Sequence, residues 1–467
     1  MFAESASNSP GFRQLRISHF RPPEKVAHRL DWKQRLAGAT LPRFACSLEG
    51  RTCVRRIVFG FALCVLLAAP AWAQTVAIRA GNLINPATGT VAKNQIILVK
   101  DQKIVDVGPS VAIPADAQVV DLSGEWVMPG VMDAHTHITQ SVQYFHELDS
   151  NYLREDTPLR ALRGLWTGET LLNAGITTVR DVGNDANFAA VALRKAIEKG
   201  WFVGPTIQTA GKIIAPFGGQ TGGIPQEIGP FWQFEYYDAD NPEEIRKAVR
   251  ENIYYGADLI KLVADNSDYH YSVDEIRAAV DEAHHANKAV AVHVLGGEAA
   301  DNVIAGGVDS IEHGFFLTDD QLRRMKEKGM FLSGTDFPTA HFEAGQFKGA
   351  KVVGAAIVDR LTRAYKIGVK MAFGTDIVTD APNETRADMT WDYLAVWRAA
   401  GVPPAEILKC MTTNDAELLR ISNQRGAIAK GLFADIIAMP ESPLDNIESL
   451  RKVNFVMKNG AIVRRPK

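Results

Sequence analysis

Two histidines separated by one residue, His135 and His137, give the first indication of chemistry in this 467-residue chain. They follow an apolar run, and side chains two residues apart on a β-strand point to the same side. Two imidazoles on one side can bind a single metal ion. Such a pair is a weak signal by itself, because polar residues often lie where a strand ends. Its meaning depends on what the other strands place beside it.

A lysine within an apolar run is the second indication. Lys261 lies in the segment Leu-Ile-Lys-Leu-Val, which is typical of a central parallel strand buried on both faces. A buried ammonium group without a partner is costly, so such a group tends to lose its proton. A neutral lysine amine can react with CO2 to give a carbamate, an anionic ligand that can bridge two metal ions. The alternative is a lysine at a strand end whose amine reaches solvent.

Two further histidines end apolar runs. His293 ends the run 289–294, and His313 lies near the end of 308–314. Each taken alone is more often a hydrogen-bonded structural residue. Together with the first pair, on successive strands, they complete a set of imidazole ligands.

The predicted elements that would position these residues alternate between strands and helices along the chain. The helical stretch after Ser272 begins with a capping box, in which Ser272 is followed by Glu275. Eight apolar strands separated by helices predict an α/β fold, a (β/α)8 TIM barrel with its active groups at the carboxyl ends of the strands. The alternative is a doubly wound open sheet, although no GxGxxG loop follows a strand. The predicted strands are 127–137, 177–183, 204–210, 258–265, 289–294, 308–314, 330–336 and 370–376.

The barrel order distinguishes two Gly-Thr-Asp motifs. Asp336 follows His313 by enough residues for one helix and one strand, so it ends the seventh strand. Asp376 ends the eighth strand, which closes the barrel beside the first strand and its histidine pair. We therefore predict Asp376, rather than Asp336, as metal ligand and general base.

The two ends of the chain following residue 74 are rich in short strands and turns, including Asn459-Gly460, a strong hairpin signal. We expect residues 74–129 and 424–467 to pair into one small β-sandwich domain. The barrel would then span 130–423.

The first 73 residues contain a pattern typical of a sequence that targets a protein for export. Residues 54–73 contain Arg55-Arg56, a short apolar run and a small-x-small pattern that ends at Ala73. This pattern predicts a signal peptide cleaved near Ala73 and a periplasmic or secreted protein without a stable membrane partner; the alternative is a membrane anchor. Residues 1–53 are expected to be a non-native or disordered extension.

Composition sets limits on the remaining chain. The full 467-residue sequence is 46% apolar and 22% charged, which is ordinary for a globular protein, and its net charge of −3 suggests no nucleic-acid partner. After cleavage only Cys410 remains of the four cysteines, so no internal disulfide is expected.

These motifs, in this order, resemble those of the amidohydrolase superfamily, and within it the imidazolonepropionase-like and prolidase-like metal-dependent hydrolases. The resemblance rests on Lys261 and on four segments: PGVMDAHTH (129–137), AVAVHV (289–294), SIEHG (310–314) and FGTD (373–376). It implies a binuclear site with two divalent ions, usually Zn2+. One ion would be held by His135, His137 and Asp376, and the other by His293 and His313. N6-carboxylated Lys261 and a hydroxide would bridge them.

The implied activity is cleavage of an amide or peptide C–N bond, not a C–C bond. The bridging hydroxide would attack a dipeptide, an N-acyl amino acid or a similar small amide, with Asp376 as general base. Imidazolonepropionases lack the bridging lysine, so Lys261 favours the dipeptidase-like relatives. The alternative is a mononuclear cyclic-amide hydrolase or deaminase. Family members commonly form homo-oligomers, which we also expect here.

Substrate contacts are expected from the loops that follow the strands. The longest is 211–237, whose glycines allow movement and whose aromatic residues could line a pocket. The alternative is a packed surface loop. Other candidate substrate contacts are Arg180, Tyr269, His270, Tyr271 and His341.

Overall fold

The computed structural model describes residues 75–148, 153–183, 186–222, 224–265, 269–381 and 383–466. The predicted N-terminal extension and signal peptide therefore lie outside the described residues. Within the described part, no helix combines the length and apolar character needed to cross a membrane. Cys410 is a buried free thiol.

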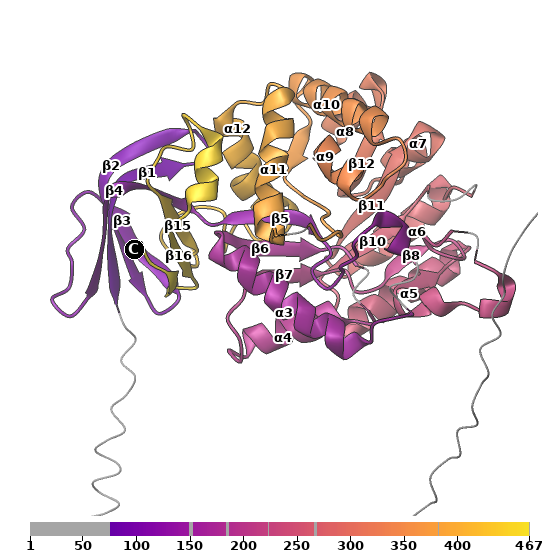
Figure 1. Cartoon of the computed structure of the whole chain (residues 1–467), viewed down its shortest axis with the longest axis horizontal. Coiled ribbons are helices and arrows are strands. Elements are labelled where there is room, and N and C mark those ends of the chain that lie inside the picture. The colour runs from indigo at the N-terminus through magenta and orange to yellow at the C-terminus, as the bar shows by residue number, and fades with distance from the viewer. Residues whose placement is uncertain are drawn as a thin grey trace, which may run out of the picture. The chain divides into compact units, whose positions relative to one another are not determined.

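Both ends of the described chain join in one seven-stranded mixed sheet, ordered β17-β16-β15-β4-β1-β2-β3. The sheet curls on itself, because Lys103 of β3 forms a bridge with Phe433 just before β15. Its buried apolar residues come from both chain ends and share one core. The prediction that the ends pair is confirmed (Figure 1). The strands are β1 (Val76–Asn85), β2 (Thr90–Lys100), β3 (Lys103–Gly108), β4 (Gln118–Pro129), β15 (Ile436–Met439), β16 (Phe455–Lys458) and β17 (Ala461–Arg464).

The central part is a parallel barrel whose eight strands match the eight predicted ones. The main-chain nitrogen of Ala134 donates to Phe373 O at 2.7 Å, which closes the ring between its first and last strands. Asp258 N donates to Thr209 O at 2.7 Å and joins the third strand to the fourth. The strands are β5 (Val131–Thr136), β6 (Ile176–Asp181), β7 (Thr206–Thr209), β10 (Leu259–Val263), β11 (Ala289–Gly296), β12 (Ser310–Phe316), β13 (Phe331–Ser333) and β14 (Lys370–Ala372).

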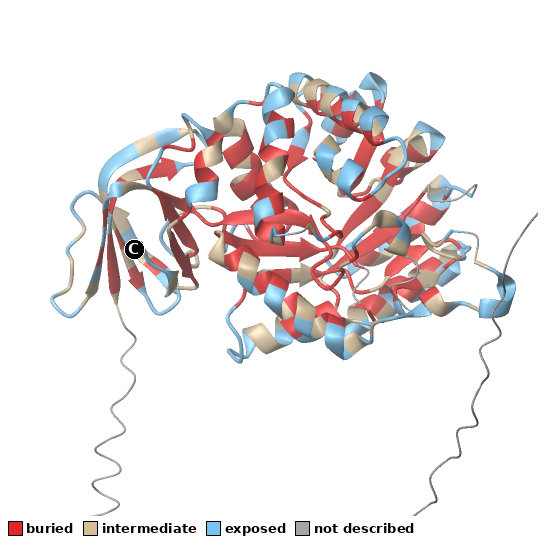
Figure 2. Ribbon diagram, in the orientation of Figure 1, coloured by how far each residue is buried: buried red, intermediate tan, exposed pale blue. Residues whose placement is uncertain are grey.

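Helices surround these strands and bury one face against them, while the opposite face stays exposed (Figure 2). The predicted capping box is confirmed: Ser272 Oγ accepts from Glu275 N at 3.3 Å, and Glu275 Oε2 accepts from Ser272 N at 2.8 Å. The longer helices are α3 (Thr157–Asn173), α4 (Ala189–Glu198), α5 (Pro242–Tyr255), α6 (Val273–His285), α7 (Gly297–Gly306), α8 (Asp319–Lys328), α10 (Ala350–Ile367) and α11 (Arg386–Ala399). The shorter ones are α9 (Thr339–Ala344), α12 (Pro404–Lys409) and α13 (Asp415–Leu418).

Part of the segment 211–237 packs against the barrel, as the packed-loop alternative expects. It contributes β8 (Ile213–Ala215) and leads into β9 (Tyr236–Asp238), and β8 pairs with β10 where Ile214 faces Leu262. Trp232 in this segment is buried, and its Nε1 donates to Asp238 Oδ1 at 2.9 Å. Trp232 and Tyr236 therefore pack a local core with residues of β8 and β10, while Phe217 and Phe234 are exposed.

Candidate metal centre

The first and last barrel strands bring two histidines to one carboxylate. His137 Nε2 lies 3.1 Å from Asp376 Oδ1, and His135 Nε2 lies 3.6 Å from the same oxygen. Main-chain pairing supports this arrangement, since Asp376 N donates to His135 O at 2.7 Å. The two imidazoles and the carboxylate thus face one point at the carboxyl end of the barrel.

Two more imidazoles complete the cluster from neighbouring strands β11 and β12. The ring centroids of His293 and His313 are 4.3 Å apart, and those of His135 and His313 are 5.0 Å apart. Donor atoms of His135, His313 and Asp376 all lie within 4.8 Å of one another, close enough to hold one metal ion. The structure therefore brings together all four histidines that the sequence singled out.

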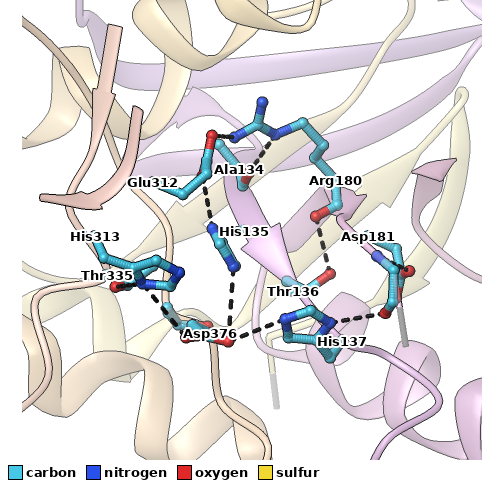
Figure 3. A network of polar contacts seen from close by, with 12 residues as sticks. Ala134, His135, Thr136, His137, Arg180, Asp181, Glu312, His313, Thr335 and Asp376 are labelled. Carbon is cyan, nitrogen blue, oxygen red and sulfur yellow. Dashed lines mark hydrogen bonds and ion pairs between the residues drawn. The ribbon is translucent and has the colours of Figure 1, made fainter. Parts of the chain in front are cut away.

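Hydrogen bonds to the Nδ1 atoms fix the orientation of the histidine rings (Figure 3). His137 Nδ1 is 2.7 Å from the carbonyl of Gly183, and His313 Nδ1 is 2.8 Å from Thr335 Oγ1. A carbonyl oxygen only accepts, so the His137 proton is on Nδ1 and Nε2 carries a free lone pair. That is the tautomer that a metal-binding imidazole needs.

Three residues of the cluster have left-handed backbone conformations. The φ angles are 70° at His313, 44° at Thr335 and 58° at Asp376. A residue other than glycine loses roughly 1–3 kcal/mol in such a conformation, and these conformations concentrate at active sites. The barrel therefore holds strained backbone at the point where its candidate ligands meet.

Lys261 is buried on β10, and its charge acts on three of the four imidazoles. Burial lowers the pKa of Lys261 to about 8, against the opposing charges of Glu312 and Asp376. Burial, helped by Lys261, lowers the pKa of His293 to about 3 and that of His135 well below its ordinary value. His135, His293 and His313, whose pKa values are all lowered, therefore favour the neutral form, which is the form that binds metal. For His137 the hydrogen bond and charge of Asp376 outweigh burial and raise the pKa.

The donor set also passes a direct test for a metal site. Among the buried atoms without a hydrogen-bond partner are His135 Nε2, His293 Nε2 and Asp265 Oδ1. Buried polar atoms are normally paired, so unpaired nitrogens on two of the clustered histidines are consistent with a missing cation. Asp265 Oδ1 is 3.6 Å from His293 Nε2. Sequence reasoning did not single out Asp265, which lies two residues beyond the end of β10.

Regular strand alternation predicts that Glu312, the neighbour of His313, points away from the site, and the structure shows that this prediction is wrong. Its carboxylate contacts His135 Nδ1 at 2.6 Å. The cause is the positive φ of His313, which interrupts the alternation of the strand, so that both neighbours turn inward. Arg180 donates to the other oxygen of Glu312 at 2.8 Å. Although burial raises the pKa of Glu312, Arg180 and Lys261 outweigh this and hold it below its ordinary value.

Asp336 lies outside the cluster, as predicted from the order of the strands around the barrel. Its carboxylate forms a buried ion pair with Arg360 at 2.9 Å. The structure thus places Asp376, and not Asp336, beside the histidine pair.

The candidate substrate contacts occupy different surroundings. Arg180 is fully buried against Glu312, and the Tyr271 hydroxyl, also buried, donates to Ala239 O at 2.7 Å; both positions suit a structural role. Tyr269 and His270 are exposed, and Tyr269 donates to Glu275 at 2.8 Å. His341 pairs with Asp392 at 2.9 Å. For Tyr269, His270 and His341, substrate contact stays a prediction.

Gly374 lies against His135, a candidate metal ligand. A Cβ atom there would lie 2.6 Å from the Cβ of His135 and 2.6 Å from Ser333 Oγ. We expect Gly374→Ala to displace the imidazole and to lower kcat/KM by about a hundredfold, as misplacement of a reacting group by about 1 Å can do. Gly124→Ala is the matched control, because its Cβ would meet no atom within 4 Å. Equal steady-state rates for the two variants would contradict the prediction.

Comparison with known proteins assigns the fold and the cluster to a family. Residues 126–463 match the amidohydrolase family. The chain belongs to the amidohydrolase family. It is 30% identical over 438 residues to ochratoxinase from Aspergillus niger, an alignment that covers 84% of this chain and 88% of that protein. As an amidohydrolase of this group, the chain is a hydrolase that acts on carbon–nitrogen bonds.

Solved amidohydrolase structures agree with this assignment. A Xaa-Pro dipeptidase with methionine bound in its active site is 29% identical, with a TM-score of 0.75 over 84% of this chain and 100% of that one. A prolidase complexed with N-methylphosphonate-L-proline has the same identity, score and coverage. The predicted resemblance to prolidase-like amidohydrolases is confirmed.

Proposed function

We propose that this amidohydrolase uses divalent metal to cleave the amide or peptide C–N bond of a small substrate, such as a dipeptide or an N-acyl amino acid. The observation that carries the proposal is the convergence of His135, His137, His293, His313 and Asp376 at the carboxyl end of one barrel. Imidazole and carboxylate ligands in this number suit Zn2+.

The ligands divide naturally between two ions. His135, His137 and Asp376 would hold one, and His293 and His313 the other. Lys261, buried and in the electrostatic range of three of these imidazoles, would bridge the ions as its N6-carboxylated form. This division is supported by the buried nitrogens of His135 and His293 that lack a partner.

Bound divalent ions supply Lewis-acid chemistry, which polarises the scissile carbonyl and makes water acidic enough to attack at neutral pH. The chain supplies the proton transfers. The side chain of Asp376 keeps 17% of its surface exposed, so one carboxylate can face both the ligand cluster and an incoming substrate. Asp376 accepts a proton from the attacking water and passes it to the leaving nitrogen, as a general base and then a general acid.

The substrate class is supported by the relatives. The dipeptidase structure holds methionine and the prolidase structure holds a phosphonate analogue linked to proline. Such ligands are amino acids or short peptide-like molecules. A short peptide or an N-acyl amino acid is accordingly the substrate we propose for this chain.

The test is a hydrolase screen with metal-free and zinc-reloaded protein. Dipeptides, including Xaa-Pro dipeptides, would be compared with N-acyl amino acids and with ketone analogues that replace the C–N bond by a C–C bond. We expect turnover of amides only, lost with chelator and restored with Zn2+. Turnover that survives complete metal removal would contradict the proposal.

A one-ion hydrolase or deaminase acting on a cyclic amide is the second candidate. It is favoured by the compact triplet of donors from His135, His313 and Asp376, which suits a single ion. Metal stoichiometry separates the two candidates, because only the first requires two ions per chain.

Export and assembly stay predictions for this chain. Amino-terminal sequencing of the protein from its native source would test cleavage near Ala73, and light scattering would test homo-oligomer formation.

A further inference from the structure

A buried polar group lies behind the metal centre, on the side away from Asp376. It consists of Glu312, Arg180 and Ser310, and the proposed chemistry uses none of them. Glu312 and Ser310 have no exposed surface, and Arg180 has 1%. Charged groups at such depth are costly unless each finds a partner, so their contacts define what they do.

The carboxylate of Glu312 connects Arg180 to the first metal ligand (Figure 3). Its Oε1 accepts from Arg180 Nη2 at 2.8 Å and from Ser310 Oγ at 2.5 Å. Its Oε2 lies 2.6 Å from His135 Nδ1. Arg180 is itself fixed, because its Nε donates to the carbonyl of Ala134, the residue before His135.

These contacts determine the tautomer of His135. An ionised carboxylate only accepts hydrogen bonds, so the ring must donate from Nδ1. Nε2 is then the unprotonated nitrogen, and it is the one that lies 3.6 Å from Asp376 Oδ1 and has no hydrogen-bond partner. The short hydrogen bond at Nδ1 therefore leaves the lone pair on Nε2, at the opposite side of the ring, and this lone pair points toward the metal centre.

We propose that Glu312, held in place by Arg180, is a positioning residue that sets the tautomer and orientation of His135 and thereby the affinity of the centre for divalent metal. This inference rests on the proposed function, since it requires that His135 bind metal. The competing explanation is an ion pair that only stabilises the barrel.

Glu312→Gln separates the two explanations, because the amide has the same shape but one side of it donates. Arg180 and Ser310 both donate toward the outer oxygen, so the amide oxygen must face them. The NH2 group then faces His135 Nδ1 and forces the proton onto Nε2, the nitrogen that should bind metal. We expect zinc affinity, measured by chelator competition, to fall about tenfold to a hundredfold.

Asp336→Asn is the matched control. It neutralises another buried carboxylate paired with an arginine, Arg360, but Asp336 contacts none of the four site histidines. Its zinc affinity should stay within twofold of the wild type, whatever happens to its unfolding temperature. If Glu312→Gln folds and also binds zinc within twofold of the wild type, the proposal is wrong.

The double variant Arg180→Met, Glu312→Gln tests the mechanism itself. Without the guanidinium, the glutamine amide can turn, donate to Ser310 and present its oxygen to His135. We expect the double variant to bind zinc more tightly than Glu312→Gln alone, although it lacks one more buried contact. A further loss of affinity would overturn the tautomer mechanism and favour a structural role.

One measurement needs no variant and keeps this inference separate from the proposed function. Long-range nitrogen–proton correlation spectra of the metal-free wild type, with 15N-labelled histidine, report which ring nitrogen carries the proton. We expect His135 to be protonated on Nδ1 only. Protonation on Nε2 would overturn the tautomer assignment even if zinc binds. A wild type that is protonated on Nδ1 but binds no zinc would instead overturn the proposed function, and with it the role of Glu312 in metal affinity.

Discussion

Replacing Asp376 by asparagine is expected to lower kcat/KM by at least about a thousandfold while the protein stays folded. The change removes one anionic ligand and the group that accepts a proton from water, and general-base catalysis alone contributes roughly 10²–10⁴. Asparagine tolerates positive φ, so the strained backbone at 58° can be kept. Steady-state kinetics with zinc-loaded protein measures the effect.

Asp336→Asn is the control for this prediction as well. It changes the aspartate of the other Gly-Thr-Asp motif, whose partner is Arg360 rather than a histidine. We expect it to keep most of its activity and to lose stability. If Asp376→Asn retained activity within tenfold of the wild type, Asp376 could not be the general base.

Lys261→Met is expected to abolish turnover, lowering it by at least about a hundredfold, while the unfolding temperature stays the same or rises. Methionine has a similar length and removes an ammonium group that is buried at 2% exposure, which is costly to bury. It cannot react with CO2, so the proposed bridge between the ions is lost. Activity and thermal unfolding, measured on one preparation, show both effects.

The carbamate can also be observed directly. Protein reloaded with zinc in 13C-labelled bicarbonate should show one carbamate carbon that is absent from Lys261→Met. Lys261→Arg is the matched variant that keeps a positive charge but cannot form a carbamate, because a guanidinium does not lose its proton at this pH. Full activity in Lys261→Arg would contradict the bridging role.

The barrel and its ligand positions were predictable because they depend on order along the chain. Parallel strands each end at the same face, so residues after successive strands must converge even when they lie far apart in sequence. This reasoning placed Asp376 beside His135 and set Asp336 apart. It needed only the alternation of strands and helices along the chain, which the spacing of apolar residues predicts well.

The inward turn of Glu312 was not predictable from the same pattern. Strand alternation puts neighbours on opposite sides, but the left-handed backbone of His313 breaks this rule. Such a conformation is unusual for histidine and is imposed by tertiary contacts. The pairing of Arg180 with Glu312 was not predictable for the same reason.

The segment 211–237 shows a second limit of the sequence pattern. Its glycines indicated a loop, yet Trp232 and Tyr236 are buried with Val263 of β10. Short strands such as β8 and β9 carry too few residues to show a period of their own. Their existence depends on pairing with β10, which only the folded chain provides.

Zinc stoichiometry tests the central claim most directly, namely that four imidazoles, one carboxylate and a modified lysine form a two-ion centre. Metal-free protein would be titrated with Zn2+, passed through a desalting column and analysed for zinc and protein content. We predict two ions per chain for the wild type. A wild type that retains one ion or none at saturation would contradict the two-ion centre.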